Sequence, residues 1–241
     1  EKWGYSIASA DLLKLWLQQL PFDSVSTAER RAYITAASLC GVDKKRVFSP
    51  DDLEMIAHYR NPYREWIGAQ IRADIWGYLN PDSPSTAAAM AYNDARISHS
   101  KNAIYASMFM AALIASAFTA ENAFDAIARG LQFVPTTSRV YSAVQAGISL
   151  GTECGNQEEL INALHREFGS YHPVHSINNA AVVASALVFG GDDFAKTIAT
   201  AVLTGWDSDC NGASAGSVWG VLYGAPKIPE KWTKPLNDRL Y

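Results

Sequence analysis

Apolar residues recur through most of the chain at intervals of three and four positions, which is the period of an amphipathic α-helix. Ala10–Leu20 shows this stripe and stops at Pro21, because proline does not continue a helix. A polar connection over Val42–Pro62 has room for a short helix that starts at Asp51. The same period predicts further helices over Thr27–Leu39, Tyr63–Leu79, Thr86–Ile97, Ile104–Phe118, Glu121–Gln132, Arg139–Leu150, Gln157–Phe168, Asn179–Phe189, Asp193–Leu203 and Asn211–Leu222.

Few runs alternate with a period of two, and no repeat of fixed length is visible. Frequent Ala, Ser and Gly residues within the helical ranges let helices approach one another closely. With 241 residues, 49% of them apolar and 18% charged, the chain is long enough to bury a sizeable core. We therefore predict an all-α fold, a multi-helix bundle that forms a single domain over residues 1–241.

Charge and cysteine content exclude several classes of protein. Lys and Arg total 20 against 24 Asp and Glu, so no excess of positive charge points to nucleic acid or to an anionic membrane. The Ala-rich run Ile104–Phe118 is too short to span a bilayer. Cys40, Cys154 and Cys210 are widely spaced, with no CxxC pair, which argues against a disulfide framework and favours a reducing, cytoplasmic location.

The sharpest chemical feature is the pair Asp207 and Asp209, which lies between Gly205 and Asn211 just before a predicted helix. Two carboxylates at positions i and i+2 of a tight turn can point at one hard divalent cation. The alternative is a helix cap, in which an acidic or amide side chain accepts hydrogen bonds from free backbone N–H groups. Spacing alone favours the helix cap, because acidic caps are common just before a helix.

Two blocks carry a resemblance to a known family. The first is Gly205–Ala213 (GWDSDCNGA) with the small residues that follow it. The second joins Gly68–Arg72 (GAQIR), the break at Pro81–Pro84, and Asp94–His99 (DARISH). Together they resemble the ADP-ribosylglycohydrolase superfamily, in which a Gly-rich segment ends in Met-Arg and a later helix ends in Thr-His. Here Ile71 and Ser98 replace the Met and the Thr.

The resemblance implies an all-helical fold with two metal ions, usually Mg²⁺, beside a cleft that binds ADP-ribose. Asp207 and Asp209 would be metal ligands and would take part in catalysis. Cys210 stands where relatives place Thr or Ser as an oxygen ligand. Because sulfur is a poor ligand for Mg²⁺, this position would weaken one site or favour Mn²⁺; alternatively, Cys210 is only a small buried residue.

Four further residues would face the substrate if the resemblance holds: His99, Gly68, Arg72 and Tyr105. A glycine lets the backbone approach a ligand, and the planar guanidinium of arginine suits a diphosphate. Each also has a purely structural alternative. Arg72 could pair with Asp74 or Glu65 to tie helices together, and His99 could cap the helix that it ends.

Two motifs of the family are not found, a Gly-Asp-Ala helix and a Thr-Asp-Asp-Thr turn, which supply the remaining metal ligands. Glu1–Gly4 resembles the segment just downstream of that turn. The sequence thus looks like the later part of a domain that an upstream segment or a second chain would complete. We expect a metal-dependent hydrolase of an N-glycosidic or related bond to ADP-ribose. The alternatives are hydrolysis of another N-ribosyl compound and a catalytically inactive module that binds ADP-ribose or a protein.

Overall fold

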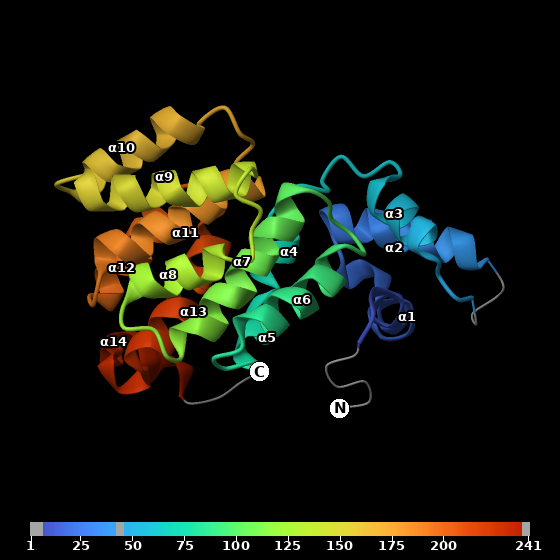
Figure 1. Ribbon diagram of the computed structural model, residues 1–241, viewed down its shortest axis with the longest axis horizontal. Coiled ribbons are helices and arrows are strands. Elements are labelled where there is room, and N and C mark those ends of the chain that lie inside the picture. Colours follow the sequence, from blue (N-terminus) through green and yellow to red (C-terminus); the bar gives the residue numbers. More distant parts are fainter. Residues whose placement is uncertain (1–6, 42–45, 238–241) are drawn as a thin grey trace.

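The computed structural model describes residues 7–41 and 46–237, and helices form nearly all of their regular structure (Figure 1). No β-strand occurs in these two ranges, where Trp66 and His175 form an isolated antiparallel bridge. The predicted all-α fold is therefore confirmed. The helices are α1 (Ser9–Gln19), α2 (Thr27–Cys40), α3 (Pro50–His58), α4 (Gly68–Ile71), α5 (Asp74–Tyr78), α6 (Pro84–Ala95), α7 (Asn102–Ala117), α8 (Ala123–Leu131), α9 (Arg139–Glu153), α10 (Gln157–Phe168), α11 (Ser176–Gly190), α12 (Phe194–Leu203), α13 (Ser208–Tyr223) and α14 (Glu230–Thr233), with short 3₁₀ turns at Phe22–Ser24, Ala225–Lys227 and Lys234–Leu236.

The prediction of one helix over Tyr63–Leu79 is wrong. The structure has two short helices there, α4 and α5, and the residues before Gly68 are not helical. Their backbone groups bond a distant loop instead: Ile67 N–H donates to Val174 O at 2.9 Å, and Glu65 O accepts from Ser176 N–H at 3.0 Å. A pairing between segments so far apart in the chain leaves no local pattern in the sequence.

Several other helix starts differ from the prediction by one to three residues. Helix α13 starts at Ser208 and not at Asn211, because Asn211 N–H already donates to Asp207 O at 2.9 Å. The short helix expected from Asp51 is α3, which Ser49 caps by accepting a hydrogen bond from Asp52 N–H. Glu1–Gly4 and the first residues of Val42–Pro62 lie outside the described residues.

The main core forms around α7 and α11, which are buried along almost their whole length. Both are rich in Ala and larger apolar residues, with a few Ser and Asn residues among them, so they present apolar surface in most directions and need neighbours on most sides. Helices α9 and α12 pack on α11, and α6 and α8 pack on α7 (Figure 1). This arrangement buries the start of α11 and the start of α13 against each other.

Helices α9 and α11 approach each other unusually closely. A Cβ added to Gly147 would lie 2.5 Å from the carbonyl oxygen of Ala181, and one added to Gly151 would lie 2.8 Å from that of Ser185. The two glycines are one turn apart on the same face of α9, so the absence of side chains there sets the spacing between the helices.

A smaller core cluster joins α1, α2 and α3 to the end of α6 through residues such as Leu13, Ile56 and Ile97. These N-terminal helices lie on the opposite side of α6 from α8 and α12 (Figure 1). Among the described residues, no helix combines the length and the apolarity that crossing a membrane requires.

Candidate metal centre

The predicted turn connects α12 to α13 and places Asp207 at the N-cap of α13, with Asp209 in its first turn. Gly205 has φ +79°, a left-handed conformation that glycine adopts without strain. The hydroxyl of Ser208 donates to Val202 O at 3.0 Å and fastens the turn to the end of α12. The side chain of Asp207 makes no capping hydrogen bond to the helix, and the Cys210 thiol is a hydrogen-bond partner of its carboxylate.

A buried asparagine of α11 holds the turn in place. Oδ1 of Asn179 accepts a hydrogen bond from the side-chain amide of Asn211 at 2.7 Å and one from Asp207 N–H at 3.4 Å. The Asn179 amide in turn donates to the carbonyl oxygens of Pro173 and His175, each at 2.8 Å. The start of α11, which carries Asn179, thus fixes the position of the turn that presents the two carboxylates.

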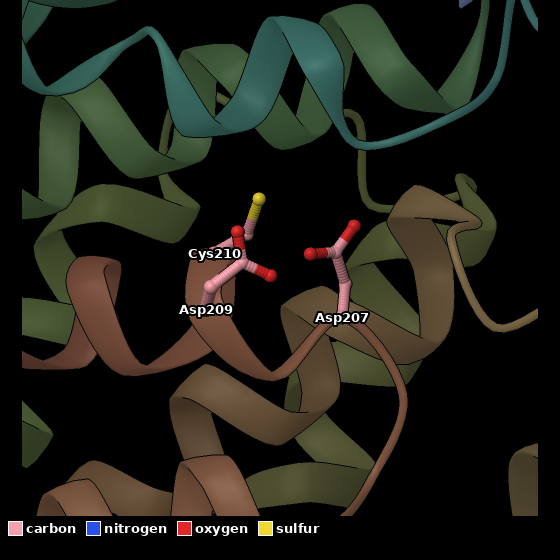
Figure 2. A group of neighbouring side chains, drawn as sticks. All are labelled: Asp207, Asp209 and Cys210. Atoms are coloured by element: carbon pink, nitrogen blue, oxygen red, sulfur yellow. The ribbon is translucent and has the colours of Figure 1, made fainter.

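Three potential ligand atoms converge at the start of α13. One atom each from Asp207, Asp209 and Cys210 lie within 4.8 Å of one another, and the three side chains rise from the same side of the helix (Figure 2). Two carboxylates are the hard oxygen donors that Mg²⁺, Mn²⁺ or Ca²⁺ prefer. The turn therefore has the donor set of a divalent-cation site, and the geometry brings together the residues that the sequence singled out.

Burial and mutual repulsion shape the electrostatics of this cluster. Partial burial raises the pKa of Asp207, Asp209 raises it further, and a hydrogen bond from the Cys210 thiol opposes both effects. Burial, followed by the nearby carboxylates, raises the pKa of Cys210 far above its ordinary value. The sulfur is accordingly a thiol at neutral pH, a poor ligand for a hard cation.

The second predicted block forms a different cluster, centred on Arg72. Its guanidinium donates to Asp94 Oδ2 at 2.7 Å, to Glu29 Oε1 at 2.6 Å and to the Ser98 hydroxyl at 3.0 Å. Arg72 therefore does pair with carboxylates and join helices, but the expected partners, Asp74 and Glu65, are wrong: the partners are Asp94 and Glu29. The network ties α2, α4 and α6 together.

His99 lies at the inner side of the same network and is 1% exposed. Its Nδ1 is 2.9 Å from the Ser98 hydroxyl, and its Nε2 is 3.9 Å from Glu29 Oε1. Burial, with a smaller contribution from Arg72, lowers its pKa well below the ordinary value, so the imidazole is neutral. Glu29 also lies against Gly68, where any side chain would collide with its carboxylate.

The predicted substrate residues thus divide into groups. Gly68, Arg72 and His99 gather around Glu29, whereas Tyr105 is partly buried against the main core. None of these residues has a hydrogen bond or ion pair to the Asp207 turn among the described residues. The first turn of a helix is an ordinary place for an acid, so nothing in the sequence distinguishes Glu29 from other helix-start acids.

Asn179 was also missed, although a signal was present. The pair Asn178–Asn179 interrupts an otherwise apolar helix, and both side chains are fully buried. Buried amides need hydrogen-bond partners, so such a pair in a helix core points to a polar site beside it.

Comparison with known proteins gives one match. The family model described as ADP-ribosylglycohydrolase matches residues 4–241. No match was found among curated proteins or among solved structures. The matched range includes the Asp207 turn, the Arg72 cluster and every described helix. The chain therefore belongs to the ADP-ribosylglycohydrolase family.

Proposed function

We propose that this protein is a metal-dependent hydrolase that cleaves an N-glycosidic or related bond to ADP-ribose. The observation that carries the proposal is the convergence of Asp207, Asp209 and Cys210 within 4.8 Å at the start of α13. The family contributes the substrate class, because its members are hydrolases named for ADP-ribosyl substrates.

The donor set fits a divalent cation that prefers oxygen. Asp207 and Asp209 would hold it, and the close approach of two carboxylates is favourable once a positive charge lies between them. A thiol at Cys210 adds little to Mg²⁺ binding, so this position would favour Mn²⁺ over Mg²⁺ more than a hydroxyl would. The two-ion centre expected from the family needs oxygen ligands beyond these two carboxylates.

The chain's own residues would divide the work between binding and positioning. When bound, the cation would polarise ribose hydroxyls and make a bound water more acidic. Asn179 would keep both carboxylates aligned through its bonds to Asp207 and Asn211. For Gly68, Arg72, His99 and Tyr105 we keep a role at the substrate. Arg72 would act mainly by fixing the backbone near Gly68, since its guanidinium is already shared between Glu29 and Asp94.

The test is release of ADP-ribose from arginine- or serine-modified peptides in the presence of Mg²⁺ or Mn²⁺. Activity should disappear with a chelator and fall by about two orders of magnitude or more in Asp207→Asn and in Asp209→Asn. Asp192→Asn, which changes an exposed carboxylate at the other end of α12, is the matched control and should retain activity. Full activity of both site variants would contradict the assignment.

A catalytically inactive ADP-ribose-binding module is the second candidate. The sulfur at Cys210, in place of a hard ligand, favours it. Titration calorimetry with ADP-ribose, read together with the release assay, separates the two candidates. The inactive module would bind ADP-ribose but would not release it from any modified peptide. If the substrate is another N-ribosyl compound, such as a nucleoside, the protein should hydrolyse that compound when it replaces the peptide in the release assay, and should leave the modified peptides intact.

A further inference from the structure

His165 of α10 contacts the residues on both sides of Gly205, in the segment that leads from α12 to Asp207. Its Nε2 lies 2.7 Å from the carbonyl oxygen of Thr204. Its ring lies 4.7 Å from the Trp206 ring, centre to centre, with an angle of 48° between the two planes. His165 is itself exposed, so it reaches this segment from the outer side of the molecule. An outer helix is thereby joined to the approach to the candidate metal centre.

The hydrogen bond to Thr204 serves a carbonyl group that α12 leaves without a partner. Thr204 is the C-cap of α12, and the last carbonyl oxygens of a helix accept no hydrogen bond within it. Thr204 is 1% exposed, so water has little access to that oxygen. A carbonyl oxygen only accepts, so Nε2 of His165 carries the hydrogen. His165 therefore supplies a donor that neither the helix nor the solvent provides.

Gly205 is the point of this segment where the backbone has the most freedom. Its φ is +79°, and glycine can take many conformations that other residues cannot. After Gly205, the N–H of Asp207 donates to Asn179 Oδ1 over a long 3.4 Å. Before Gly205, His165 holds the carbonyl group of Thr204. The direction in which the chain enters α13 is thus set by anchors on both sides of the glycine, and His165 is the one that lies outside the main core.

We propose that His165 is a positioning residue for the candidate metal centre. It acts through Thr204 and Trp206, by keeping the backbone before Asp207 in one conformation, and it does not contact the ion. Trp206 is the immediate neighbour of Asp207, so a change in the backbone there moves the carboxylate as well. Residues that orient metal ligands without touching the ion still contribute to affinity. This inference rests on the proposed function, because it requires a divalent cation at Asp207 and Asp209.

Mn²⁺ titrated into the full chain by calorimetry tests the proposal. Gln157 provides a matched control, because it also joins α10 to α12: its amide donates to the Thr200 hydroxyl at 2.9 Å, one turn before Thr204. His165→Ala should weaken Mn²⁺ binding by about tenfold, whereas Gln157→Ala should leave the affinity within about twofold of wild type. An unchanged affinity in His165→Ala would overturn the proposal. Equal losses in the two variants would also overturn it, since they would reflect a general loosening of α10.

A conservative variant tests the hydrogen bond itself. His165→Gln keeps a side-chain N–H that can reach the carbonyl oxygen of Thr204 but lacks the imidazole ring. It should therefore recover part of the Mn²⁺ affinity that His165→Ala loses. A Gln variant that binds Mn²⁺ as weakly as the Ala variant would refute positioning through Thr204.

Amide hydrogen exchange, measured without metal, separates this inference from the proposed function. Gly205 N–H donates to Val202 O and Asp207 N–H donates to Asn179 Oδ1. In His165→Ala both amides should exchange faster by about tenfold, while the amides of α7 exchange as in wild type. Unchanged exchange at both positions would refute the role of His165 even if wild type binds Mn²⁺. Faster exchange in the variant, together with no Mn²⁺ binding by wild type, would instead refute the metal site and retain the anchor.

Discussion

The side-chain amide of Asn211 donates a 2.7 Å hydrogen bond to Oδ1 of Asn179, and both side chains are completely buried. This bond joins the start of α13, which carries the candidate metal ligands, to the start of α11 in the main core. Since Asp207 N–H shares the same acceptor, one amide oxygen positions both the backbone and the helix that present the carboxylates.

Replacing Asn179 by Ala should destabilise the protein by about 1 to 3 kcal/mol, because the Asn211 amide is left buried without a partner. Urea unfolding measures the change, and weaker Mn²⁺ binding should accompany it. The double variant Asn179→Ala/Asn211→Ala should lose less than the sum of the two single variants. Strictly additive losses would show that the two residues do not act through this bond.

Divalent metal should stabilise the folded chain. If it binds only the folded form, a hundredfold excess over its dissociation constant adds about 2.7 kcal/mol. Thermal melts with Mg²⁺ or Mn²⁺ should show a rise for wild type and for Asp192→Asn, and little or none for Asp209→Asn. A wild-type melting temperature that saturating metal leaves unchanged would contradict the site.

The thiol of Cys210 should also affect which metal ion the candidate metal centre prefers. Cys210→Ser places a hard oxygen where the thiol stands, so the affinity for Mg²⁺ should increase relative to that for Mn²⁺. The ratio of the two dissociation constants, measured by calorimetry on wild type and variant, tests it. A ratio that does not change would mean that residue 210 is not a ligand.

The buried Asp74 of α5 should make the free energy of unfolding depend on pH. Burial raises its pKa from 3.8 to about 6, while a hydrogen bond from Ser217 of α13 opposes the rise. The folded chain therefore holds this proton more tightly than the unfolded chain does. The resulting contribution to stability is complete below about pH 4 and is lost as the pH rises through about 6.

Asp74→Asn keeps an acceptor for Ser217 and removes the charge. It should be more stable than wild type by about 2 to 3 kcal/mol at pH 8 and nearly equal to it below pH 4. Urea unfolding at intervals from pH 3.5 to pH 8 provides the comparison. A difference between the two proteins that is constant across this range would show that Asp74 ionises normally.

Lys101→Gly should stabilise the fold, because Lys101 has φ 50° and ψ −122°, a combination that L-residues rarely adopt. The strained backbone costs on the order of 1 to 3 kcal/mol, and the extra freedom of glycine in the unfolded chain offsets roughly 0.5 to 1 kcal/mol of the gain. The melting temperature should therefore rise. Lys101→Ala is the control, since it retains Cβ and the strain. Equal melting temperatures for the Gly and Ala variants would indicate that position 101 is unstrained.

How much the sequence predicted depended on whether a feature was local. Asp207 and Asp209 are two residues apart at a helix start, so their convergence follows from a single turn, and most helix ranges follow from the apolar period. Arg72 meets Asp94, which lies 22 positions later in the chain, and Glu29, which lies 43 positions earlier. Spacing along the chain does not reveal which carboxylates an arginine meets over such distances. The interrupted helix before Gly68 has the same cause, since Ser176 reaches back 111 residues to bond Glu65.

The two glycines on the α11-facing side of α9, Gly147 and Gly151, have a consequence for the candidate metal centre. Adding a methyl group at Gly147 forces α11 away at Ala181, and Asn179 is only two residues earlier on that helix. A shift of Asn179 would act on Asp207 and Asn211 through the hydrogen bonds that its side-chain oxygen accepts, without changing Asp207, Asp209 or Cys210. Graded substitutions at Gly147, from alanine to serine, would therefore change the geometry of the candidate metal centre from a helix that contributes no residue to it.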